Sequence, residues 1–433
     1  MRVKKFFITL FPISITIIIF DKIKLPFDPP ISIYRPLQMF ILLLMFITIL
    51  TKRNIKSNSS SLTTILLYFF VFFTLISTLF ARNLTNSLLR TFQIGEFTIM
   101  VLILFFYLKI FWDISYVKDL AQLMCWLGIF SGVTIISDFF GWTDFVTIIY
   151  DYRGYGRQVG ILGEPNFAAG KLAIFLPFII YASFKNQKEG KMVKSRIYAI
   201  LSLVVSIAIL MTGSRMGIIM LVITFTFIIL KERKYLISIK SAKTFIILCL
   251  FLLIIGTTFW QNAKFRYLAT HRVGSLYHFI TIGEKAEGID MRLELLKPSW
   301  QMFSTNPILG LGPGGYRWEL PQYVPSMGER PSHNTFIDVL VGIGIFGFLF
   351  FVGILIQIAY NIRSLRKIMP LKNLSFYFGL SFLNLLVMLF FLSHLHNRFL
   401  WGMFIPISMV IEWNKKAKKR KYKKLVNAED KSE

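Results

Sequence analysis

Long apolar stretches recur along the whole chain and are separated by shorter polar links. Most of these stretches are about twenty residues long, the length that a helix needs to cross a bilayer core of ~30 Å. The pattern therefore predicts an all-α polytopic membrane protein, with a single membrane domain over residues 1–433 and about twelve transmembrane helices. The predicted spans are residues 4–20, 36–50, 62–80, 94–112, 117–139, 167–184, 197–212, 216–230, 244–259, 335–360, 374–392 and 399–413.

The links that carry most of the Lys and Arg alternate with links that carry few. Because basic links stay in the cytoplasm, this alternation orients the chain and places both of its ends inside. The links predicted outside include residues 141–166 and 260–334, of which the second is a large extracytoplasmic loop. A loop of that length usually has a function. The predicted cytoplasmic segments are residues 51–60, 185–196, 231–243 and 361–373, followed by a basic tail at 414–433.

The short link Gly213–Arg215 is predicted to form a tight turn between two helices. If residues 197–230 were instead one bent helix, the basic links at 185–196 and 231–243 would fall on opposite sides of the membrane, which argues against that alternative. Within the long loop, residues 289–305 form a helix-compatible run that Pro298 interrupts.

The composition agrees with a membrane protein and narrows the chemistry. Hydrophobic residues make up 55% of the chain and charged residues 16%, and the formal net charge is +27. This basic excess lies largely in the predicted cytoplasmic segments, where residues 415–424 would contact anionic lipid headgroups, so it does not favour nucleic-acid binding. The two cysteines, Cys125 and Cys249, both lie inside apolar stretches, which argues against a disulfide framework and against a cysteine metal site.

Candidate catalytic residues stand where the predicted outer links meet the helices. His333 closes the long loop just before a span and is a candidate general base, although a hydrogen-bonded interfacial histidine is the plainer interpretation. Ser332 is predicted to cap the helix that follows. Arg215 stands in the tight turn, where its guanidinium could bind phosphate oxygens through paired donors or could simply anchor the helix at the membrane surface.

Further polar residues gather on the same predicted side. Several arginines beside a histidine suggest a polyanionic ligand, and acids inside spans suggest function, although helix capping or an ion pair would also explain them. The arginines are Arg153, Arg157 and Arg292, and the acids are Asp338 and Glu96. Asn166 begins a span after Pro165, and Asn334 follows His333. His394 and His396 occupy the last outer link.

Four motifs in a fixed order make the chain resemble the O-antigen ligase and O-antigen polymerase superfamily of bacterial membrane glycosyltransferases. GEPNFAAG (163–170) is similar to the Pro-Asn segment of that family, and TGSRMG (212–217) is similar to its Ser-Arg turn. Arg292 and the glycine-rich run 307–316 resemble its large periplasmic loop. SHNTFIDVLVGIGIFG (332–347) resembles its His-Asn signature. The resemblance is strongest over residues 140–350, and the twelve-span plan fits it too.

The resemblance implies a glycosyltransferase of the multi-span GT-C type in the bacterial cytoplasmic (inner) membrane, with its active site on the extracytoplasmic face. It implies a glycan on undecaprenyl diphosphate as donor, a glycan or lipid as acceptor, and no metal ion or other cofactor. His333 would be the base for the acceptor hydroxyl and Arg215 a ligand of the diphosphate. Supporting contacts to phosphate or glycan would come from Arg153, Arg157, Arg292, Asn334 and Asn166.

Two other classes of function compete with this one. A transporter or flippase of lipid-linked oligosaccharide would need polar or broken-helix features near the membrane midplane, whereas the polar residues here gather at one surface. A structural scaffold would leave the ordered motifs without a purpose. Within the family the motifs do not separate a polymerase from a ligase. We favour a polymerase slightly, because nothing in the chain indicates a lipid A acceptor.

Overall fold

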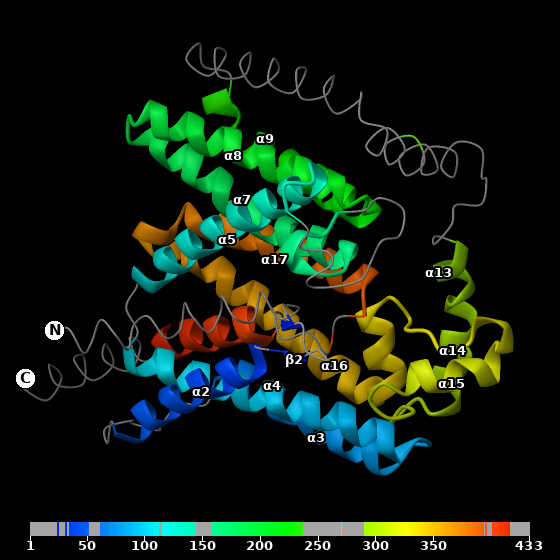
Figure 1. The fold of residues 1–433 in the computed structure, drawn as a ribbon. Helices are drawn as coiled ribbons and strands as arrows, with labels where there is room; N and C mark the ends of the chain where they lie inside the picture. The colour runs from blue at the N-terminus through cyan, green and yellow to red at the C-terminus, as the bar shows by residue number, and fades with distance from the viewer. Residues whose placement is uncertain are drawn as a thin grey trace, which may run out of the picture.

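The computed structural model describes residues 24–25, 31–32, 34–51, 61–111, 115–143, 158–236, 270, 290–393, 395 and 401–415. Nearly all the regular structure in these residues is helical, as Figure 1 shows. The strands among them are a two-residue antiparallel pair, β1 (Lys24–Leu25) and β2 (Ile31–Ser32). The helical class predicted from the sequence is thereby confirmed for the described part of the chain.

Seven of the described helices are long and apolar enough to cross a membrane, so the chain is a membrane protein. They match seven predicted spans and comprise α3 (Leu62–Leu79), α4 (Leu84–Phe111), α5 (Ser115–Phe139), α7 (Pro165–Lys188), α8 (Met192–Met211), α16 (Thr335–Ser364) and α17 (Leu374–Phe391).

Three further predicted spans coincide with helices that are shorter or more charged. These are α2 (Tyr34–Thr51), α9 (Arg215–Leu236) and the helical residues 401–415. The predicted spans 4–20 and 244–259, residues 416–433, and most of 260–289 lie outside the described residues. The total of twelve spans therefore stays a prediction.

Two helix boundaries can be compared with the predicted spans. α8 ends at Met211 and α9 begins at Arg215, so the tight turn is confirmed; Gly213 has φ 62°, a conformation that glycine adopts without strain. The fourth span, predicted from residue 94, was placed too late, because α4 already begins at Leu84. Its first turns carry Arg90 and other polar side chains that lower the hydropathy without preventing a helix.

Residues 290–327 form a small helical unit at one end of the bundle, which we call the cap. It contains α13 (Asp290–Glu294), α14 (Leu296–Thr305), α15 (Gly315–Tyr323) and the 3-10 turn η4 (Pro325–Met327), all on the right in Figure 1. The predicted break near Pro298 is confirmed, because α13 ends four residues earlier and Pro298 lies in the first turn of α14, where a proline is tolerated. The cap has its own apolar core, formed by Leu295, Met302, Leu311, Tyr316 and Leu320 together with Val341 of α16.

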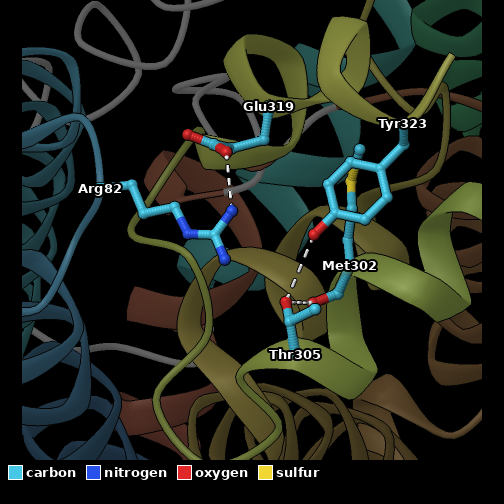
Figure 2. Close-up of polar contacts among 5 residues, drawn as sticks. All are labelled: Arg82, Met302, Thr305, Glu319 and Tyr323. Atoms are coloured by element: carbon cyan, nitrogen blue, oxygen red, sulfur yellow. Dashed lines mark hydrogen bonds and ion pairs between the residues drawn. The ribbon is translucent and has the colours of Figure 1, made fainter.

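Polar contacts attach the cap to the turn between α3 and α4, and others form within the cap (Figure 2). Arg82, in the turn between α3 and α4, forms an ion pair with Glu319 of α15, with Nη1 and Oε2 3.3 Å apart. Glu319 is only 5% exposed while Arg82 is 46% exposed, so water weakens the attraction and the pair contributes at most about 1 kcal/mol. Inside the cap, Thr305 Oγ1 donates to the carbonyl of Met302 and lies 3.4 Å from the hydroxyl of Tyr323.

α16 is broken at Gly344, and the loop of the cap fills the break. Gly344 has φ 74° and ψ −174°, which interrupts the helical hydrogen bonds. The amide of Leu311 donates to the Val341 carbonyl at 2.9 Å, and the amide of Ile345 donates to the Pro307 carbonyl at 2.9 Å. The helical bond that would join Ile345 to Val341 is thus replaced by two bonds to the loop. Because unpaired backbone groups are costly in a membrane, this exchange makes the break tolerable.

The glycine-rich run is inserted into the bundle at this break. A Cβ at Gly310 would come within 2.6 Å of the Gly342 carbonyl, and one at Gly312 would collide with Ser87 and Ala81. Both glycines also have positive φ. Only residues without a side chain allow two backbones to pass this closely. The glycines are therefore required for the loop to reach α16.

Gly344→Ala tests the break. We expect a loss of about 1–3 kcal/mol in the free energy of unfolding, because alanine disfavours φ 74° and its Cβ would overlap the Ile308 carbonyl. The matched control is Gly379→Ala in α17, where the nearest atom to the new Cβ is 4.0 Å away and a helical glycine is replaced by a better helix former. Thermal unfolding in detergent measures both. Equal midpoints for the two variants would contradict the role of the break.

Candidate functional site

A cavity of ≈ 410 Å³ lies where the cap meets the first turns of α4, α7 and α16. Its lining includes two arginines, a histidine and two carboxylic acids: Arg90, Arg317, His333, Glu164 and Asp338. Asn166 and Trp318 line it too, as do Leu392 and Ser393, which follow α17. The fold thus brings the Pro-Asn motif and the His-Asn motif to one place, although the sequence separates them widely.

His333 has an unusual backbone conformation, with φ 54°. Such a left-handed conformation costs a residue other than glycine about 1–2 kcal/mol, and strained residues of this kind cluster at functional sites. Hydrogen bonds on both sides hold it in place. The Asn334 amide donates to Ser332 Oγ at 3.0 Å, and Asn334 Oδ1 accepts from the amides of Phe336 and Ile337.

Asn334 is therefore the N-cap residue of α16, and the prediction that Ser332 would be the N-cap was wrong. Ser332 bonds elsewhere, because its Oγ lies 2.6 Å from Asp338 Oδ1 and 3.4 Å from Ser393 Oγ. Ser332 thus links the first turn of α16 to the end of α17. Asp338, in the first turn of α16, thus accepts a hydrogen bond from a residue that precedes the helix, and it also lines the cavity.

The surroundings of His333 keep its ring neutral. Burial and, to a smaller extent, the positive charges of Arg292 and Arg330 together lower the pKa of His333 to about 4. At neutral pH the imidazole therefore keeps a lone pair that can accept a proton. Arg292 lies nearby with its guanidinium 5.6 Å from the centre of the Phe391 ring; burial lowers its pKa, and the charge of Glu164 opposes that shift.

The start of α7 and the start of α9 are joined by hydrogen bonds. Glu164 caps α7 by accepting from the amides of Asn166 and Phe167, and it also accepts from Asn166 Nδ2 at 2.8 Å. Ser214 Oγ then donates to Asn166 Oδ1 at 2.9 Å. Arg215 follows directly as the first residue of α9. The Ser-Arg turn is thus attached to a residue that lines the cavity.

Two arginines at this site were not identified from the sequence. Arg90 lines the cavity from α4, and its Nη1 donates to Gln93 Oε1 at 3.0 Å. Gly314 allows it to lie there, because a Cβ at that position would come within 2.8 Å of Arg90 Cγ. Arg317 lines the cavity from α15, with its guanidinium 5.2 Å from the ring centre of Trp318. If the fourth predicted span had been extended back to Leu84, Arg90 would have been placed inside α4. No sequence motif identifies Arg317.

The remaining predicted residues lie elsewhere. Arg215 and Arg292 are not among the side chains that line the cavity as the described residues form it, and the side-chain oxygen of Asn334 is engaged in capping. Tyr316, by contrast, does line the cavity, although its ring belongs to the core of the cap; burial raises the pKa of its hydroxyl to about 12. Glu96 lines a separate apolar groove. Arg153, Arg157, His394 and His396 lie outside the described residues.

The arrangement suits an anionic ligand. Arginine side chains approach the cavity from α4 and α15, and the N-termini of α7 and α16, where helix dipoles favour negative charge, open onto it. Within the described residues no group of three or more His, Cys, Asp or Glu is placed to hold a metal ion. These features define a polytopic helical membrane protein with a polar cavity, lined by two arginines, two acids and a neutral histidine, at the end of the bundle where the cap lies.

The comparison with known families agrees with this class. The family model described as O-antigen ligase matches residues 199–352, which run from α8 through the cap into the second part of α16. This match confirms the resemblance to the O-antigen ligase/polymerase superfamily, whose members are glycosyltransferase-like enzymes of polysaccharide assembly. No curated protein matches the chain.

His333→Gly and His333→Ala together test the strained conformation. Both variants remove the imidazole, but only glycine adopts φ 54° without a steric cost. We therefore expect His333→Gly to exceed His333→Ala by up to about 1 kcal/mol in the free energy of unfolding. Chemical denaturation of the purified variants measures the difference. If His333→Ala were the more stable of the two, the strain would be absent.

Proposed function

We propose that the protein transfers a glycan from an undecaprenyl-diphosphate donor to an acceptor hydroxyl during surface-polysaccharide assembly, on the extracytoplasmic face of the cytoplasmic membrane. The observation that carries the proposal is the neutral His333 in a cavity that arginines approach from two helices. The family match supports the class of enzyme, and the geometry supports the roles of the individual residues.

The arginines have the chemistry to bind the diphosphate of the donor. A guanidinium presents paired donors that match phosphate oxygens, and such contacts strengthen as negative charge grows on the leaving group. In this proposal Arg90 and Arg317 bind the diphosphate inside the cavity. Arg215 and Arg292 bind it from the edge, because each lies next to a residue that lines the cavity or interacts with one. Arg153 and Arg157 precede Asn166 in the same predicted link and would add contacts to the glycan.

His333 accepts the proton of the attacking hydroxyl in this mechanism. The hydroxyl oxygen forms a bond to the anomeric carbon of the donor sugar, and the bond from that carbon to the phosphate oxygen breaks. The electron pair of the broken bond stays on the diphosphate, and the proton moves to the imidazole. Asn334 and Asn166 position these groups, since the first caps α16 directly after His333 and the second joins the Ser-Arg turn to α7.

We favour a polymerase slightly over a ligase, because nothing in the sequence indicates a lipid A acceptor. Trp318, an aromatic residue of the cap, lines the cavity and can stack on a sugar face. The alternative of a transporter is weaker, because the break in α16, a feature that would favour it, is closed by the cap loop through two backbone hydrogen bonds.

His333→Ala and Arg215→Lys test the proposal in cells. We expect His333→Ala to lower transfer by ~10²–10⁴-fold, the usual effect of losing a general base. Arg215→Lys keeps the charge but loses the paired donors, and we expect a loss of roughly 10²-fold. Polysaccharide on the cell surface and glycan left on the lipid carrier are both measured by electrophoresis.

Arg363→Lys is the matched control, because Arg363 is exposed at the opposite end of α16. It should leave transfer unchanged at equal protein level. Single repeat units on the acceptor would identify a polymerase, and long glycans left on the carrier would identify a ligase. Normal polysaccharide from well-expressed His333→Ala would remove the base from the mechanism, and movement of the intact lipid-linked glycan across the membrane without transfer would support a flippase.

The pH dependence of transfer gives a further test. Because the pKa of His333 lies near 4, the base is neutral above that pH and becomes protonated, and inactive, as the pH falls through it. We expect kcat/KM, which reports the free enzyme, to hold between pH 8 and about 5. A bound diphosphate would offset the charges of Arg292 and Arg330, so the acid limb of kcat should lie at higher pH. An acid limb of kcat/KM near pH 6.5 would contradict this environment for the base.

A further inference from the structure

The exposed surface of the cap is divided into an apolar part and a polar part. Between residues 291 and 334, all of which the structure describes, the exposed large hydrophobic side chains lie close together in the chain. They are Leu293 of α13, Leu296 and Trp300 of α14, and Ile308 of the cap loop, and their exposed fractions range from 51% to 66%. We call these four residues the apolar edge. In residues 309–334 the exposed side chains are instead charged, polar or proline.

The exposed side of α14 is itself divided along its length. Leu296 and Trp300 are four residues apart, so they lie on one face of the helix. Lys297 and Gln301 are also exposed, and each directly follows one of these apolar residues. They therefore form a polar line about 100° further around the helix. An apolar line beside a polar line is typical of a helix that lies at the boundary between lipid and water.

A backbone hydrogen bond fixes the height of Ile308 along α16. The amide of Ile345 donates to the carbonyl of Pro307, the residue before Ile308, at 2.9 Å. Arg363, in the last turn of α16, follows Ile345 by eighteen residues, which is ~27 Å of helix at ~1.5 Å per residue. The apolar core of a bilayer is ~30 Å thick. When Arg363 lies at one edge of that core, Ile308 therefore lies at the opposite edge and not in the water beyond it.

α14 lies close to the same level. Its Met302 belongs to one apolar core with Val341 of α16, and Val341 is four residues, ~6 Å of helix, from Ile345. Trp300 is two residues from Met302, on the exposed side of α14. Tryptophan is enriched at the membrane–water interface, where a large apolar ring with one polar group fits. The exposed position of Trp300 agrees with that depth.

The apolar edge continues the lipid-facing surface of the bundle. Phe346 follows Ile345 in α16 and is 42% exposed, and Leu349 is 56% exposed. Because α16 is long and apolar enough to cross a membrane, these side chains contact acyl chains. The hydrogen bond between Pro307 and Ile345 places Ile308 next to this surface. Lipid that covers α16 therefore reaches the apolar edge of the cap as well.

We propose that the apolar edge is inserted into the leaflet of the bilayer next to the cap, with Lys297 and Gln301 at the headgroups. The occupant is lipid, because the edge adjoins a lipid-facing helix at membrane depth and is bordered by a polar line. A second copy of the chain, or another protein, on this edge is the competing outcome. The proposal does not depend on the proposed function.

Insertion would change the role of the cap. The cap belongs to a segment that the sequence predicts as an extracytoplasmic loop, and the apolar edge would attach it to the membrane from the side. α14 and α15 share one apolar core, and Arg317 lines the polar cavity from α15. The attachment would therefore also hold Arg317 at a constant height relative to the headgroups.

Wild-type protein tests the contact without any substitution. The full-length chain is held in nanodiscs of phosphatidylethanolamine and phosphatidylglycerol that include a phospholipid with a diazirine in its acyl chain. Cross-linked peptides are mapped by mass spectrometry. We expect label on residues 293–308 as well as on the exposed face of α16, and none on residues 317–330. Labelled α16 together with unlabelled residues 293–308 would overturn the proposal.

Trp300→Cys and Gln301→Cys then locate the boundary, each in a chain whose own cysteines are removed by Cys125→Ser and Cys249→Ser. A nitroxide is attached, and its relaxation by oxygen, which concentrates in lipid, is compared with its relaxation by a water-soluble nickel chelate. We expect oxygen to dominate at position 300 and the chelate to dominate at position 301, the matched control. Dominance of the chelate at position 300 would place the edge in water. Exclusion of both reagents there would mean that protein covers it, and either result would overturn the proposal.

Discussion

The exchange of backbone hydrogen bonds at Gly344 holds the cap, the broken helix and the site in one arrangement. Val341 and Ile345 give up their mutual helical bond and pair with Leu311 and Pro307 of the cap loop. Ser77 of α3 adds a bond to the Gly342 carbonyl at 2.7 Å. In a membrane these groups have no water to bond to, so each depends on the others. The loop cannot leave without exposing α16, and α16 cannot straighten without expelling the loop.

The site follows from this arrangement. Val341 belongs to the apolar core of the cap, so the cap packs against the first part of α16, next to His333. The loop then runs past the first turns of α4, where Gly314 lies against Arg90. The cavity therefore combines a histidine fixed by the start of one helix with an arginine fixed by another. Gly314 of the inserted loop leaves room for Arg90, while the hydrogen bonds of Ser332 and Asn334 hold His333.

Hydropathy and charge alone predicted the long described helices, most of their bounds, and the tight turn at Gly213–Arg215, because each depends on local composition. The motif order also predicted that the segments around Asn166 and His333 would belong together, and both line the cavity. The break at Gly344 could not be predicted in this way, because Pro307 and Leu311, whose backbone groups replace the helical hydrogen bond, lie more than thirty residues before it. Arg90 was missed for a related reason. Its role depends on contact with the cap, while its own segment looks like a polar link.

The broken helix also sets an order in which the protein can be assembled. Residues 307–311 precede α16 in the chain, so they leave the ribosome before the helix whose backbone they pair with. Until α16 is inserted, the cap lacks Val341 from its core and its loop has no partner in the membrane. α3, which contains Ser77, and α4, whose Ser87 lies against Gly312, precede α16 in the chain and are inserted before it. Insertion of α16 is thus the step that closes the structure, and a chain interrupted before it would contain Arg90, Arg317 and His333 without the helix against which the cap packs.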